Sequence, residues 1–91
     1  MMAYDMKRGM EMEMEMEMNL DRLMPGLHGI IVSVNTDELL RLRLRDFGLV
    51  NGTKVTVRYK SPDGGVTALE LRGTVVALRT CELKKIRVRL I

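Results

Sequence analysis

One stretch decides the fold of this 91-residue chain: Arg43-Leu44-Arg45-Asp46-Phe47-Gly48-Leu49-Val50-Asn51-Gly52. An amphipathic run ends in it at Gly48, and a glycine suits the left-handed residue that follows a helix C-terminus because it has no Cβ. The dipeptide Asn51-Gly52 is typical of a turn. The stretch therefore predicts a helix that stops at Gly48 and a turn that leads directly into a strand.

The residues before this stretch predict an α-helix from about Asp37 to Phe47. Asn35 or Thr36 is the expected N-cap, and the acidic residues that follow lie in the first turn, where they interact favourably with the helix dipole. Leucine and arginine alternate from Leu39 to Arg45 as they would in a strand, but the leucines also recur at helical spacing. The capping residues and Gly48 decide for a helix.

Three arginines of this helix are expected in different places. At about 100° per residue, Arg41 and Arg45 fall on the outer face, whereas Arg43 falls inside the apolar arc that ends at Phe47. We therefore expect Arg43 to be partly buried. Its stem should cover the core, and its guanidinium should bind backbone carbonyls or a carboxylate.

The residues on either side of the helix predict five short strands, at 28–34, 53–60, 66–72, 74–78 and 86–90. In the second strand Val55, Val57 and Tyr59 should face the core, while Lys54, Arg58 and Lys60 should form a basic outer face. Leu20 and Leu23 are expected to close one end. The fold class is mainly β, a small SH3-like barrel of about five strands with one inserted helix. The expected core consists of Ile30, Val32, Leu40, Leu44, Phe47, Leu49, Val55, Val57, Leu69, Leu71, Leu78, Ile86 and Val88.

Length and composition allow a single domain. Hydrophobic residues make up 46% and charged residues 30% of the chain, as in a globular protein. No apolar run approaches the roughly 20 residues that span a bilayer, and no signal peptide is recognisable, so a cytoplasmic protein is expected. The single cysteine, Cys81, cannot form an internal disulfide.

Charge is uneven along the chain. Residues 1–26 hold three basic and six acidic side chains, a net charge of −3, whereas residues 27–91 hold twelve basic and six acidic side chains, a net charge of +6. A basic folded part can bind an acidic protein, an anionic membrane or nucleic acid, or it can simply be solvated.

The first part of the chain contains a strict alternation of methionine and glutamate from Met10 to Met18. A strand would place methionine on one face and glutamate on the other, yet both residues also favour helices. Methionine could bind soft metal ions, but low complexity favours a tail. We expect residues 1–18 to be a mobile or loosely docked tail and residues 19–91 to be the barrel domain.

The sequence contains no constellation for catalysis. It has no nucleophile motif, no phosphate-binding glycine loop and no ligand cluster among His28, Cys81 and the acidic residues. We expect no enzyme activity, no cofactor and no tight metal site. The only aromatic residues are Tyr4, Phe47 and Tyr59, too few for a proline-rich-peptide groove or for base stacking.

The spacing of the central stretch resembles that of the ferrous-iron transport protein A family. The resemblance runs from about Leu20 to Leu90. It implies an SH3-like barrel that acts as an accessory to the membrane transporter called ferrous-iron transport protein B. The matching residues are Arg43, Leu44, Phe47, Gly48, Leu49, Gly52, Gly73, Ala77, Leu78 and Arg79.

Two functions remain open at this stage. The resemblance implies a non-enzymatic accessory of ferrous iron uptake, a monomer or weak homo-oligomer that binds the cytosolic domain of the transporter. The alternatives are a small basic barrel that binds nucleic acid and a stand-alone relative of the SH3-like domain of iron-dependent repressors. The candidate partner-binding residues are Arg41, Arg45, Lys54, Arg58 and Lys60.

Overall fold

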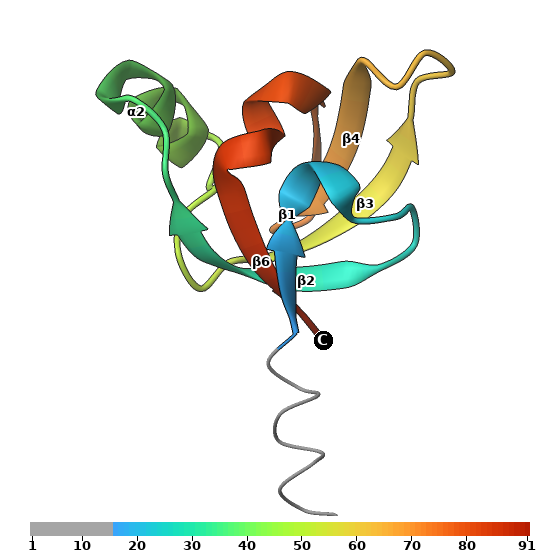
Figure 1. Cartoon of the computed structure of the whole chain (residues 1–91), viewed down its shortest axis with the longest axis horizontal. Helices are drawn as coiled ribbons and strands as arrows, with labels where there is room; N and C mark the ends of the chain where they lie inside the picture. Colours follow the sequence, from blue (N-terminus) through green and yellow to red (C-terminus); the bar gives the residue numbers. More distant parts are fainter. Residues whose placement is uncertain (1–15) are drawn as a thin grey trace, which may run out of the picture.

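The computed structural model describes residues 16–91, which form a strongly bent antiparallel sheet with one α-helix at its side (Figure 1). The expected mainly β barrel with one inserted helix is confirmed, with six strands in place of about five. The elements in chain order are β1 (Glu17–Asn19), the 3-10 helix η1 (Leu20–Arg22), β2 (His28–Val34), α2 (Glu38–Asp46), β3 (Lys54–Lys60), β4 (Val66–Leu71), β5 (Thr74–Arg79), the 3-10 helix η2 (Thr80–Lys85) and β6 (Ile86–Leu90).

The strand order is β1-β6-β2-β3-β4-β5, so β1 and β5 are the two edges. Two pairings contain a register shift, β2 with β6 between Ile31 and Ser33, and β3 with β4 between Val57 and Tyr59. A β-bulge of this kind bends and twists the sheet locally. The pairing of β4 with β5 has no such shift.

The additional strand, β1, begins inside the stretch that we expected to be tail. Glu17 and Met18 pair with Arg89 and Val88 of β6. Arg87 holds the strand from the side, because one guanidinium nitrogen donates to Asn19 Oδ1 at 3.1 Å and another lies 3.7 Å from Glu17 Oε1. The sheet thus starts two residues before the expected boundary at residue 19. Most of the Met/Glu alternation, residues 10–15, lies outside the described residues.

The core is a single apolar cluster inside the bent sheet. Leu20 and Leu23 are fully buried and lie in and just after η1, as expected. In β2 the inward residue is Ile31, so the prediction of Ile30 and Val32 as core residues was wrong by one position. Nearly every residue of that strand is apolar, and the pattern therefore could not reveal which ones face inward. The cluster consists of Leu20, Leu23, Ile31, Leu44, Leu49, Val55, Val57, Leu69, Leu71, Leu78, Leu83, Ile86 and Val88.

Two aromatic residues placed on the core face are exposed instead. Phe47 is 43% exposed because it lies at the C-cap of α2, and Leu49 fills the core position beyond the turn. Tyr59 is 57% exposed because the bulge after Val57 changes which residues of β3 face inward. Leu40, also expected in the core, is partly buried and packs against it.

The sequence predicted the C-terminal end of α2 correctly but not its N-cap. The N-cap is Asp37, not Asn35 or Thr36, since Asp37 Oδ1 accepts a hydrogen bond from the Leu40 amide at 2.9 Å. At the other end Gly48 has φ of 93°, as predicted. The amides of Gly48 and Leu49 donate to the carbonyls of Arg45 and Leu44, both at 2.9 Å, which is the Schellman pattern. No helix in residues 16–91 has the length and apolar character needed to cross a membrane.

Candidate docking site

A surface hollow of about 470 Å³ lies between α2, the end of β2 and the loop that enters β3. The sharp redirection of the chain at Gly48 creates it, because that turn sets the segment 49–51 beside the helix. Polar groups form one part of its wall and apolar side chains form another. The lining residues are Ser33, Val34, Asn35, Arg41, Arg45, Leu49, Val50 and Asn51.

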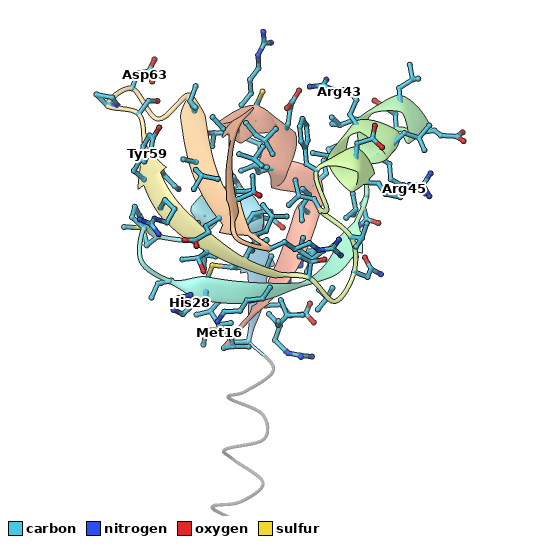
Figure 2. The ribbon with its side chains drawn as sticks, turned by 180° about the vertical axis from the view of Figure 1, so that it is seen from behind. Met16, His28, Arg43, Arg45, Tyr59 and Asp63 are labelled. Atoms are coloured by element: carbon cyan, nitrogen blue, oxygen red, sulfur yellow. The ribbon has the colours of Figure 1, made fainter. Side chains whose placement is uncertain are left out.

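Two arginines supply the charge of this hollow. Arg41 and Arg45 are one helical turn apart, both exposed as predicted. Arg41 donates to the Thr36 carbonyl at 3.4 Å, and Arg45 forms no ion pair within residues 16–91. Neither guanidinium is therefore neutralised by a carboxylate in this part of the chain. Figure 2 shows Arg45 directed away from the sheet.

Arg43 does not have the partly buried position that we predicted. Its side chain is 62% exposed, and Nη1 lies 3.7 Å from Glu82 Oε2 of η2. Leu44 is the only residue of α2 that is buried, so the helix packs along a narrow line that leaves Arg43 outside. The expected carboxylate partner is present, but an exposed ion pair of this kind contributes only about 0–1 kcal/mol.

The basic residues of β3 are divided by the bulge. Arg58 forms an ion pair with Glu70 on β4. Lys60 is half-buried and donates to the Asp21 carbonyl at 2.7 Å, so it does not share a face with the other two. Lys54 and Arg58 instead line a second hollow together with His28, whose Nδ1 lies 2.8 Å from Thr56 Oγ1.

The remaining residues of the family motif lie in turns, in the core or on the edge strand β5. Gly52 and Gly73 have positive φ angles of 89° and 78° in turns, and Leu78 is buried. Ala77 and Arg79 are exposed on the edge strand β5. Within residues 16–91 no group of three or more His, Cys, Asp or Glu side chains converges as metal ligands would.

Sequence analysis found the two arginines of the hollow but not its other half. Leu49 was correctly assigned to the core, but Val50, Asn35 and Asn51 received no role in binding. Only the Schellman turn brings these residues beside the outer face of α2. The signal was present in the glycine spacing, but the direction in which the turn points is a tertiary property.

The family model that describes the FeoA domain matches residues 18–90. The chain belongs to the FeoA family. The predicted resemblance is thereby confirmed, and the FeoA family is linked to ferrous iron transport. No curated protein sequence matches the chain significantly.

Solved structures agree with the family match. The FeoA protein of Chlorobium tepidum is 31% identical, with a TM-score of 0.77 over 81% of this chain and 70% of that one. The zinc complex of FeoA from Stenotrophomonas maltophilia, a prokaryotic SH3 domain protein, is also 31% identical, with a TM-score of 0.67 over 78% and 88%. A manganese-dependent transcriptional repressor shares the fold at 14% identity, with a TM-score of 0.75 over 82% and 42%.

Proposed function

We propose that this FeoA-family chain is a non-enzymatic, cytosolic accessory of ferrous iron uptake. It docks on the cytosolic domain of the membrane ferrous-iron transporter, ferrous-iron transport protein B. The observation that carries the docking surface is the hollow beside α2, where Arg41 and Arg45 lie next to the half-buried apolar side chains of Val34 and Val50. Iron is the cargo of the transporter under this proposal, and the chain contributes a surface.

The composition of the hollow sets the kind of contact. Its apolar wall can bury a small aliphatic side chain, and its arginines can bind a carboxylate with paired hydrogen bonds. Charge complementarity mainly raises the association rate, and salt screens it. The hollow is open and small, so we expect weak, salt-sensitive binding to an acidic segment of the transporter.

The test is the double variant Arg41→Glu/Arg45→Glu, with a matched control, Arg22→Glu/Lys84→Glu, at exposed basic residues outside the hollow. Binding of the purified cytosolic domain is measured at low and at physiological salt, and iron uptake is measured in cells. We expect the first variant to weaken binding about tenfold or more and to reduce uptake, because each lost pair contributes up to about 1 kcal/mol. The control should bind nearly as well as the unmodified chain.

A second basic surface is tested in the same assay with Lys54→Glu/Arg58→Glu. This variant separates the hollow beside α2 from the hollow lined by His28, Lys54 and Arg58. Equal losses in all three variants would show that net charge alone matters. Full binding and uptake by the Arg41/Arg45 variant, in a chain that remains folded, would refute docking through α2.

Binding of nucleic acid has one supporting observation, the basic hollow lined by His28, Lys54, Arg58 and Arg72. Glu70 lies in the same hollow and neutralises Arg58, and none of its lining residues is Phe, Tyr or Trp. A salt titration against DNA and RNA distinguishes this function, because the affinity of phosphate contacts falls steeply with salt. Measurable binding at physiological salt would favour it over the accessory function.

A further inference from the structure

The edge strand β5 has unused backbone hydrogen-bonding groups. It is joined to β4 by a two-residue turn in which Arg72 and Gly73 both have positive φ, 54° and 78°, the type I′ geometry. The flanking residues Leu71 and Thr74 form a hydrogen-bonded pair in such a hairpin, and the amide of Thr80 continues the same phase by donating to Gly65 at 2.9 Å. Alternate residues of an antiparallel strand bond to opposite sides.

The residues between these positions therefore point their N–H and C=O groups at the free edge. They are Val75, Ala77 and Arg79. Val75 and Ala77 make no further backbone hydrogen bond within residues 16–91, whereas Arg79 is the N-cap of η2, so its carbonyl accepts the first hydrogen bond of that 3-10 helix. The edge of β5 thus offers three donors and two acceptors in the arrangement that an added strand requires.

Apart from Arg79 at its end and α2 beside it, this edge has little of the usual protection against pairing. Its six residues pair with β4 without a bulge and include no lysine and no proline. Native edges normally carry one of these features. The opposite edge, β1, has only three residues and is held by Arg87. The regular six-residue edge with exposed Val75 is therefore the less protected of the two edges of the described sheet.

Helix α2 forms a wall beside this edge. One hollow of about 320 Å³ lies between Phe47 at the end of α2 and the start of β5, and another of about 370 Å³ lies between Arg43 and the end of β5. Arg43 lies on the side of α2 that faces η2 (Figure 2). We call this site the edge slot, defined by β5, Arg43, Phe47 and Arg72.

The charge of the edge slot is positive. Arg72 and Arg79 lie at the two ends of β5, and neither forms an ion pair within residues 16–91. Arg43 has only the long contact with Glu82. An extended segment that carries a carboxylate at every second residue would complement this distribution.

The chain itself contains such a segment, the alternation of methionine and glutamate at residues 10–15. It has six residues, the same number as β5. As an added strand, it would place methionine on the face shared with Val76 and Leu78 and glutamate on the face shared with Arg79. We propose that the edge slot binds residues 10–15 of a second copy of this chain as an additional strand.

The connection to β1 argues for a second copy rather than the same molecule. Met16 already accepts a hydrogen bond from the Leu90 amide at 2.9 Å, beside β6. All six residues before it are needed to cover β5, so none is left to connect β1 with the other edge. The alternation also lacks the glycine, proline or asparagine that a reversal of direction needs. This self-association goes beyond the proposed docking on the transporter.

The test compares the full chain with two variants. Glu11→Lys/Glu13→Lys/Glu15→Lys reverses the charge of the segment, and Val75→Glu places a carboxylate on the face of β5 that would carry the glutamates. We measure self-association by sedimentation over a concentration series. Each variant should weaken it about tenfold, because the first loses three exposed ion pairs and the second sets like charges opposite each other. As a matched control, Leu27→Glu places the same charge at an exposed residue before β2 that lines neither hollow of the edge slot, and self-association should be unchanged.

Amide hydrogen exchange identifies the surface and the occupant. The amides of Val75, Ala77 and Arg79 should become protected as the concentration of the full chain rises. This gain in protection should disappear in the variant Glu11→Lys/Glu13→Lys/Glu15→Lys. Protection that is independent of concentration but lost in that variant would assign the slot to the same molecule and overturn the proposal. So would an unchanged exchange rate at all concentrations, or protection that appears only when the transporter domain is added.

Discussion

Truncation of Leu44 tests whether the helix is placed correctly on the sheet. Leu44 is the only buried residue of α2, with 1% of its surface exposed, and it is the C3 position of the Schellman turn that packs with Leu49. Leu44→Ala removes three buried carbon atoms. At about 0.8 kcal/mol for each CH₂ group, their transfer alone costs roughly 2 kcal/mol, and the cavity left behind raises the loss to about 2–5 kcal/mol.

The matched control is Leu39→Ala in the same helix. Leu39 is 78% exposed, so the same chemical change removes almost no buried surface. Alanine is also a slightly better helix former than leucine. The free energy of unfolding should therefore change by less than about 0.5 kcal/mol.

Urea denaturation, followed by circular dichroism, measures both variants on the full chain. A typical domain has only about 5–15 kcal/mol of stability, so the loss in Leu44→Ala should move the midpoint far to lower urea at an unchanged slope. A loss below about 1 kcal/mol for Leu44→Ala, or equal losses in the two variants, would show that the packing of α2 described above is wrong.

Three other predictions concern local structure. Gly48→Ala should destabilise the protein more than Gly52→Ala in the same urea assay: both glycines have φ near 90°, but a Cβ at Gly48 would meet a leucine methyl at 3.3 Å, whereas Gly52 has open space. Asp37→Ala should cost about 0.5–2 kcal/mol by loss of the N-cap, and Thr36→Ala should cost less, which thermal melts can compare. Hydrogen bonds from a serine hydroxyl and a backbone amide lower the pKa of Asp63 below its ordinary value, so its contribution to stability is present above that ordinary pKa and is lost as pH falls through the lowered one. Proton NMR titration should place the Asp63 midpoint below that of an unstructured aspartate, and an unshifted midpoint would contradict the turn geometry.

The sequence was sufficient wherever a local rule has a single structural outcome. Gly48 needs a positive φ, and the apolar residues on either side of it predict a helix that ends in a buried turn, which the structure confirms. Leu20 and Leu23 were expected to close one end of the barrel because they precede the turn at Pro25-Gly26 as in the family it resembles, and both are fully buried. The alternation of Val55 and Val57 with polar residues also gave the correct inward face.

Tertiary structure decided what depends on the relative positions of segments far apart in the chain. The bulge after Val57 shifts the alternation, and no residue between 54 and 60 signals it, so Tyr59 and Lys60 could not be placed from the pattern. Phe47 fits a helix face in a one-dimensional pattern, but Leu49 reaches the core first because the chain reverses at Gly48. The hollow beside α2 and the free edge of β5 arise only when the sheet bends and α2 packs along one line. Such sites depend on which surfaces the fold leaves uncovered, and periodicity within a single segment carries no information about that.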